Sequence, residues 1–197
     1  MKKVIFATSN EGKMKEVREI LKDLDIELLS LKDAGVHTEI EENGKTFEEN
    51  ARIKAKIVME LTGEIVLADD SGLEVDYLDK APGIYSARFM GENTSYQIKN
   101  QYIIDQLKEA KGEERSARFV SAIACALPNG EIVTRRATVE GVIADKISGS
   151  NGFGYDPIFY VPAYGCTTAE MASELKNEIS HRGKALKAMK EVMKEHL

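Results

Sequence analysis

The chain has 197 residues, of which 43% are hydrophobic and 30% charged, and its net charge is −6 at pH 7. This length fits a single domain over residues 1–197, and the negative charge argues against nucleic acid or an anionic membrane as a partner. No apolar run approaches the ~20 residues that span a bilayer or forms a signal peptide, so we expect a cytoplasmic location.

Hydrophobic periodicity and turn residues predict an α/β fold with a mixed sheet. The strand–helix–strand order at the start of the chain indicates a parallel core, and the turn Pro128-Asn129-Gly130 predicts a hairpin that makes the sheet mixed. In chain order, we expect strands over residues 3–8, 26–31, 64–69, 73–77, 118–127 and 131–147. We expect helices after a cap at Ser9 or Asn10, over 46–61 with a capping box from Thr46 and Glu49, over 94–110, and from about residue 180.

The cysteines and histidines restrict the kind of metal site that the chain can build. Cys125 and Cys166 have no CxxC partner, so we expect two free thiols. The histidines, at positions 37, 181 and 196, are too scattered for a zinc cluster. Any metal site would therefore use oxygen ligands, which favours ions such as magnesium.

Two adjacent carboxylates, Asp69 and Asp70, follow a short apolar run that reads as a buried strand. Paired carboxylates repel each other and are costly to bury unless a cation joins them. The ends of strands in open α/β sheets are also where ligands bind. The sequence therefore predicts half of a divalent-metal site at this strand end.

Two helices carry lysines in positions that suit phosphate. The turn over residues 8–13 has small polar residues and a glycine before Lys13, and a helix N-terminus presents free N–H groups to an anion. Ordinary helix capping is the alternative interpretation. Lys54 falls inside the apolar arc of its predicted helix, with Asn50 near the edge of that arc. Lys54 therefore either extends to solvent or meets a buried anion.

Two later segments could recognise a base. In the glycine-rich loop over residues 148–154, Phe153 could stack on a planar ligand and the following Asp156 could accept hydrogen bonds from it. A flexible loop with buried aromatics is the alternative. His181 and Arg182 begin the last helix, where basic residues are locally unfavourable. They could donate to a carbonyl oxygen or a phosphate, or belong to an exposed basic helix end.

Together these features describe a nucleotide-hydrolysing site, and six motifs make the chain resemble the inosine triphosphate pyrophosphatase family, in its bacterial XTP/dITP branch. The resemblance covers nearly the whole length. The motifs are ATSNEGK (7–13), TFEENA (46–51), ADDSGL (68–73), APGIYSAR (81–88), GFGYDP (152–157) and SHR (180–182).

The resemblance implies a mixed central sheet flanked by helices, with two lobes around a long nucleotide-binding cleft. It implies hydrolysis of ITP, dITP and XTP to the monophosphate and pyrophosphate, which clears deaminated purine nucleotides, with Mg²⁺ as cofactor and a homodimer as assembly. A pyrophosphatase for other modified nucleotides is the alternative enzyme. A catalytically silent nucleotide-binding protein is the alternative from another class.

Carried over by position, the resemblance also implies roles for individual residues. Asp70 would be the general base and bind Mg²⁺ beside Asp69, with Glu41 or Glu42 completing the metal site. Phe153 would stack on the purine. Lys13 and Lys54 would neutralise the phosphates, and Asp156, Lys176, His181 and Arg182 would help to recognise or position the base. The full set of implied substrate contacts is Thr8, Ser9, Asn10, Glu11, Gly12, Lys13, Lys54, Ser71, Phe153, Gly154, Tyr155, Asp156, Lys176, His181 and Arg182.

Overall fold

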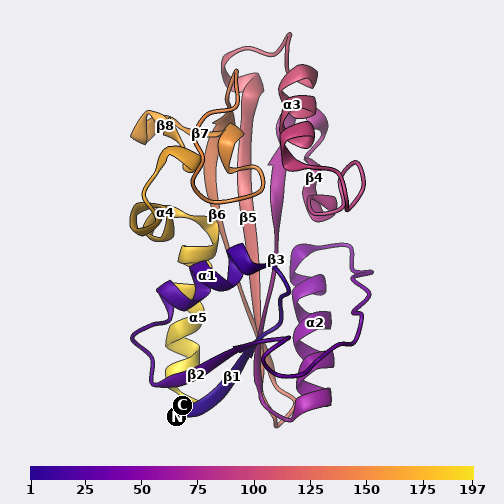
Figure 1. Cartoon of the computed structure of the whole chain (residues 1–197), viewed down its shortest axis with the longest axis vertical. Coiled ribbons are helices and arrows are strands. Elements are labelled where there is room, and N and C mark those ends of the chain that lie inside the picture. Colours follow the sequence, from indigo (N-terminus) through magenta and orange to yellow (C-terminus); the bar gives the residue numbers. More distant parts are fainter. The chain divides into compact units, whose positions relative to one another are not determined.

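The computed structural model describes residues 1–197, which form two compact units (Figure 1). Neither unit is continuous in sequence. Three long strands, β3 (Ile65–Val75), β5 (Ser116–Ala126) and β6 (Ile132–Ile143), contribute residues to both units. Unit 1 comprises residues 1–70, 121–137 and 181–197, and unit 2 comprises residues 71–120 and 138–180.

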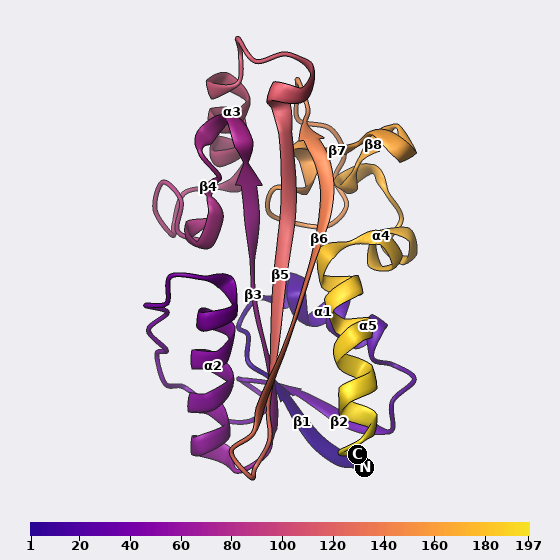
Figure 2. The same cartoon turned by 180° about the vertical axis from the view of Figure 1, so that it is seen from behind.

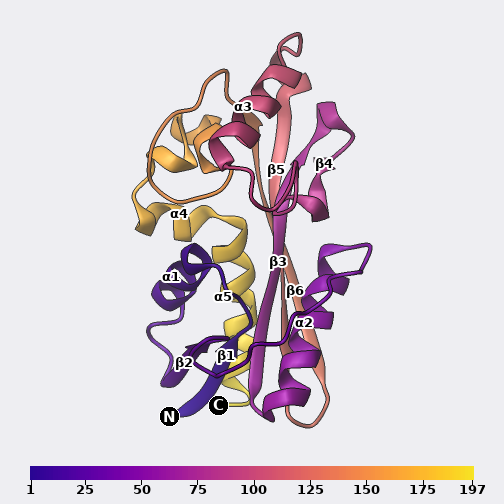
Figure 3. The same ribbon diagram turned by 45° about the vertical axis from the view of Figure 1, so that its right-hand side comes forward.

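Unit 1 is a parallel αβ arrangement. Strand β1 (Lys2–Phe6) pairs in parallel with β2 (Ile26–Ser30) on one edge and with the first residues of β3 on the other. Helices α1 (Glu11–Ile20) and α5 (His181–Lys194) lie on one side of these strands, and α2 (Phe47–Thr62) lies on the other (Figure 3). Within this unit the two chain ends lie together (Figure 2), where Lys2 Nζ donates to the carbonyl of His196.

Local capping explains where the helices of unit 1 begin and end. The Asn10 side chain accepts from the Lys13 N–H at the start of α1, and Thr46 accepts from the Glu49 N–H at the start of α2. The expected capping box is modified, because the Glu49 carboxylate accepts from the Lys45 N–H instead of from Thr46. Gly63 ends α2 in the left-handed conformation, which costs a glycine little.

Each unit has its own hydrophobic core, which the apolar faces of its helices close against the strands. In unit 1 the core lies between the strands and helices α1 and α5, with members that include Val4, Phe6, Met14, Val17, Leu67, Ile123, Leu186 and Met189. In unit 2 it lies around α3 and the strands, with members that include Leu73, Val75, Ile103, Leu107, Phe119, Ile143, Ile158 and Phe159.

Unit 2 is antiparallel and contains most of the short elements. The end of β3 pairs antiparallel with β4 (Ala81–Pro82), and β6 pairs antiparallel with β7 (Phe159–Val161), which pairs antiparallel with β8 (Cys166–Thr167). Along the whole sheet the strand order is β2-β1-β3-β5-β6-β7-β8, with β4 on β3. The helices are α3 (Tyr96–Gln106) and α4 (Ser173–Ile179). The 3₁₀ turns are Asp76–Leu78, Gly83–Tyr85, Gly112–Arg115, Asp156–Ile158, Pro162–Tyr164 and Thr168–Glu170.

The predicted fold class, a mixed sheet flanked by helices, is confirmed, and so are the two free cysteines. The predicted break in the third strand is wrong: β3 runs without interruption through Ser71-Gly72, because sheet pairing and burial override their turn preference. A separate helix, α4, precedes the last one, and extended backbone at Ser180 divides the two. No helix is long and apolar enough to cross a membrane.

Candidate active site

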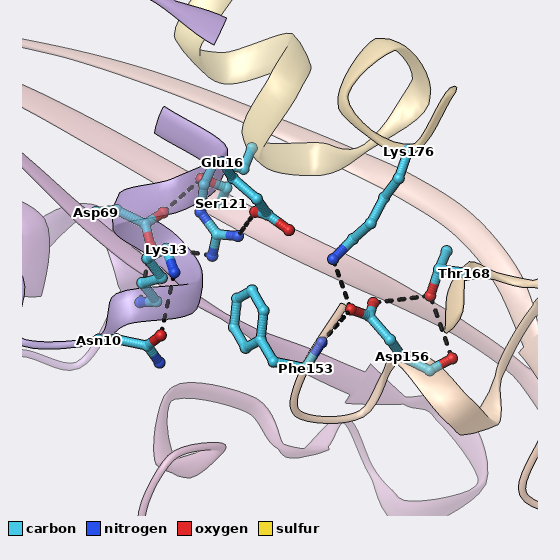
Figure 4. A network of polar contacts seen from close by, with 10 residues as sticks. Asn10, Lys13, Glu16, Asp69, Ser121, Phe153, Asp156, Thr168 and Lys176 are labelled. Atoms are coloured by element: carbon cyan, nitrogen blue, oxygen red, sulfur yellow. Dashed lines mark hydrogen bonds and ion pairs between the residues drawn. The ribbon is translucent and has the colours of Figure 1, made fainter. Parts of the chain in front are cut away.

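One group of candidate residues lies in unit 1, at the point where β3 reaches Asp69 (Figure 4). This carboxylate is 2% exposed. Its Oδ2 lies 2.8 Å from Lys13 Nζ and 3.3 Å from Arg182 Nη2, and its Oδ1 accepts from Ser121 Oγ at 2.7 Å. Burial alone would raise the pKa of Asp69, but Lys13 and Arg182 hold it well below its usual range. Asp69 is therefore a fixed anion that anchors two cations.

Arg182 explains why basic residues begin the last helix. Its side chain is 2% exposed and its guanidinium bridges Asp69 and Glu16 of α1. Because Arg182 is buried and paired with two carboxylates, the alternative of an exposed basic helix end is wrong. His181 is buried beside it in sequence. The sequence did not predict Glu16 and Ser121 at the site, since neither belongs to a local motif. Both are polar residues that are buried, and only this burial distinguishes them.

The turn before α1 has the geometry of an anion site. The Asn10 N–H donates to Thr8 Oγ1 at 3.0 Å, and Asn10 in turn caps the helix through the Lys13 N–H. Ser9 and Glu11 of this turn are exposed, and Gly12 is half-buried. Burial lowers the pKa of Lys13 and its partner Asp69 opposes this effect. Free N–H groups at a helix start and a half-buried lysine are favourable for phosphate.

Lys54 meets an anion instead of extending to solvent. Its Nζ donates to the backbone carbonyl of Asp69 at 2.8 Å and forms an ion pair with Glu42. The lysine thereby joins α2, the end of β3 and the loop before α2. Lys54 therefore lies in the apolar arc of α2, as the sequence indicates, because its side chain points to the end of strand β3.

Asp70 differs from its neighbour in having an oxygen without a partner. The side chain is 6% exposed, and its Oδ2 is buried without a hydrogen bond. Burial raises the pKa of Asp70 to about 6; Lys54 counteracts the effect, and the charge of Glu42 adds to it. Glu42 is thus within electrostatic range of Asp70, whereas Glu41 is exposed and has neither an ion pair nor a hydrogen bond.

The donor set is compatible with a magnesium-like ion, although no three His, Cys, Asp or Glu side chains are grouped as a complete metal cage. Mg²⁺ is commonly held by one or two carboxylates and completed by water and substrate phosphates. Glu42 and Asp70, whose Oδ2 has no partner, could supply two such oxygens. Asp69 remains a predicted ligand, with both oxygens already engaged by Lys13, Arg182 and Ser121.

A separate group of candidate residues lies in unit 2, in the loop that carries Phe153 (Figure 4). The Phe153 N–H donates to Asp156 Oδ2 at 2.9 Å, and Lys176 Nζ lies 2.5 Å from that oxygen. Thr168 Oγ1 donates to Asp156 Oδ1 at 2.8 Å. The ring of Phe153 is half-buried, with Lys176 Nζ 4.9 Å from its centroid. Asp156 thus fixes the loop, and a free carboxylate for reading a base is not observed.

The neighbours of Phe153 are held by α3 and by the segment after β4. Gly154 has a φ of 62°, which favours glycine, and its carbonyl accepts from Asn100 Nδ2 at 3.1 Å. Tyr155 is buried and its hydroxyl donates to the Ser86 carbonyl at 2.6 Å. Burial raises the pKa of Tyr155. Ser71, in β3, is partly exposed. The predicted substrate residue Tyr155 therefore serves the core of unit 2.

The chain is similar to known proteins over nearly its whole length. A model of the Ham1 family matches residues 4–192. The chain is 48% identical to a dITP/XTP pyrophosphatase of Clostridium perfringens over 98% of each chain, and 49% identical to one of Desulforamulus reducens over 97% of this chain and 95% of that one. A solved HAM1 protein from Coxiella burnetii superposes with a TM-score of 0.89 at 41% identity, covering 99% of this chain and 100% of that one. The chain belongs to the Ham1 family.

Proposed function

We propose that the protein hydrolyses ITP, dITP and XTP to the nucleoside monophosphate and pyrophosphate, and thereby clears deaminated purine nucleotides. The observation that carries the proposal is the buried, unpaired Oδ2 of Asp70, with Glu42 and Lys54 within electrostatic range. A protein that only binds nucleotides needs no such carboxylate, because its cost is repaid only when a water or a metal ion occupies the site. The two relatives are named dITP/XTP pyrophosphatases, which supports this reaction for dITP and XTP.

The residues of unit 1 would perform the chemistry. The turn over residues 8–13 would bind the phosphates, with Lys13 and Lys54 supplying positive charge. Glu42 and Asp70 would hold Mg²⁺, which would add charge neutralisation at the phosphates when bound. We retain Asp69 mainly as the anchor of Lys13 and Arg182. Glu42 is preferred to Glu41, because only Glu42 pairs with Lys54 and acts on Asp70.

Asp70 would act as the general base. A carboxylate whose pKa is about 6 is ionised at neutral pH, yet it is more basic than an exposed aspartate. It would take a proton from the water that attacks the α-phosphorus. A bond forms between the water oxygen and that phosphorus, the bond between the same phosphorus and the oxygen that bridges it to the β-phosphate breaks, and pyrophosphate leaves with the electron pair. Lys13 and Lys54 would balance the charge that the leaving group gains.

Residues of unit 2 would select the base. Phe153 would stack on the purine, and Asp156 with Lys176 would hold the stacking loop in place. The base would be chosen by groups that form a hydrogen bond with a 6-keto oxygen but not with a 6-amino group. Discrimination between the two would be large, because a buried polar group without a partner is costly. We further propose that the protein acts as a cytoplasmic homodimer.

A pyrophosphate-release assay with Mg²⁺ over ITP, XTP, dITP, GTP and ATP tests the proposed reaction. We expect turnover of the first three and little of GTP or ATP; equal rates on ATP and ITP would refute the base selectivity. Asp70→Asn separates the enzyme from a silent binding protein, since it should bind nucleotide while losing most turnover. Hydrolysis of ITP by this variant at the wild-type rate would show that Asp70 is not the base.

A further inference from the structure

We infer that Asn50 is a positioning residue of the metal site: its side-chain oxygen fixes the loop that brings Glu42 to Lys54 and Asp70. The inference rests on the proposed function, because it concerns how the chain prepares one of the proposed metal ligands. Asn50 lies on α2, one turn before Lys54, and its side chain is fully buried.

The loop before α2 is tied to that helix by Asn50. Asn50 Oδ1 accepts from the Gly44 N–H at 2.8 Å. The approach is so close that a Cβ on Gly44 would lie 2.7 Å from Asn50 Oδ1 and 2.7 Å from the Glu49 Cβ. Gly44 is two residues from Glu42, so the contact sets the path of the chain immediately after the carboxylate that pairs with Lys54.

The amide nitrogen of Asn50 indicates that the role of this residue is to accept the hydrogen bond from Gly44. Its Nδ2 is buried with no hydrogen-bond partner. Leaving such a donor unpaired costs about 1–3 kcal/mol, and an apolar side chain of similar size would avoid that cost. Leucine, however, could not accept from the Gly44 N–H. The same bond fixes the orientation of the amide, since a reversed amide would place the Asn50 NH₂ group against the Gly44 N–H, and both are donors.

The other contacts of the loop lie on either side of this bond. The Lys45 N–H donates to the Glu49 carboxylate, and the helix cap at Thr46 follows, so both contacts act after Gly44. Residues 36–45 form no helix or strand of their own. Before Gly44, Lys54 holds the Glu42 side chain itself, so the Asn50 contact is the bond that holds the backbone between Glu42 and the helix cap. Groups that orient a metal ligand typically change metal affinity about 10–100-fold when they are removed.

The test measures binding of Mn²⁺, a probe that shares the preference of Mg²⁺ for oxygen ligands, to nucleotide-free protein by electron paramagnetic resonance. Asn50→Ala removes the contact from the helix, and Gly44→Ala disturbs it from the loop. Asn43→Ala is the matched control, because that side chain is exposed and has no hydrogen bond. Glu42→Gln gives the affinity that remains without the ligand. Amide exchange of residues 41–45 in the metal-free protein is the second measurement.

We expect each of Asn50→Ala and Gly44→Ala to weaken Mn²⁺ binding about 10–100-fold and to speed exchange of the Gly44 amide. The double variant should bind Mn²⁺ no more weakly than the single variant with the lower affinity, because both substitutions act through one contact. Wild-type Mn²⁺ affinity in folded Asn50→Ala, even with a lower unfolding free energy, would overturn the inference and leave the proposed function intact. If the wild type binds no Mn²⁺, or Glu42→Gln binds it as tightly, the proposed metal site itself is wrong.

Discussion

Replacing the proposed base by its neutral isostere should stabilise the metal-free protein at neutral pH. Asp70 is buried, and only Lys54 and Lys13 offset the cost of its charge. Asp70→Asn keeps the shape of the side chain and removes the charge. Natural active sites often retain such destabilising groups because the reaction needs them. The variant should therefore lose turnover and gain stability together.

The magnitude follows from the pKa of Asp70, which burial raises from an ordinary 3.8 to about 6. Between these two values the folded protein keeps a proton that the unfolded chain has released, so stability falls as pH rises through this window. At about 1.4 kcal/mol for each pH unit, the full difference corresponds to about 3 kcal/mol. The wild type should lose this amount relative to Asp70→Asn between about pH 3.5 and pH 7.

Urea unfolding in EDTA, followed by circular dichroism at several pH values, measures the difference between the two proteins. Asp25→Asn is the control for the loss of one carboxylate, because Asp25 is exposed and has no ion pair. A difference between Asp70→Asn and the wild type that is constant from pH 3.5 to pH 7 would refute the reasoning. So would a variant that is less stable than the wild type at pH 7.

Three further substitutions test separate parts of the site. Arg182→Met should lower the unfolding free energy by about 3–5 kcal/mol in urea titrations, because it leaves the Asp69 and Glu16 carboxylates without their shared guanidinium; a loss below 1 kcal/mol would contradict this. Phe153→Ala should weaken ITP binding by about 1–3 kcal/mol in calorimetry while pyrophosphate binding is unchanged, and equal losses for both ligands would exclude base stacking. Lys54→Met should weaken pyrophosphate binding more with Mg²⁺ than without it; equal loss in the two conditions would show that this lysine acts independently of the metal.

Much of the fold could be predicted because local signals and tertiary structure agree. The caps at Asn10 and Thr46 and the stop at Gly63 define helices to within a residue or two. The prediction failed at Ser71-Gly72, where turn-forming residues lie inside a strand buried on both faces. The short strands β4, β7 and β8 were missed, because two or three residues carry no measurable alternation.

The candidate site was predictable where a residue breaks a local rule. Lys54 in an apolar arc and Arg182 in a first helical turn both marked buried ion pairs. Ser121, Glu16 and Asn50 break no rule that periodicity can detect, so their roles depend on contacts between distant segments. The choice of Glu42 over Glu41 likewise required the path of an irregular loop, which sequence pattern does not specify.

The charges of unit 1 suggest why the metal and the phosphates should bind together. Without ligands, each lysine is engaged by a carboxylate: Lys13 by Asp69, and Lys54 by Glu42. A cation held by Glu42 and Asp70 would compete with Lys54 for Glu42 and leave the lysine available to a phosphate oxygen. Phosphates would in turn complete the coordination that two carboxylates leave open. Because such coupling is reciprocal, each ligand should raise the affinity for the other, so Mn²⁺ should bind more tightly with pyrophosphate present than to the nucleotide-free protein.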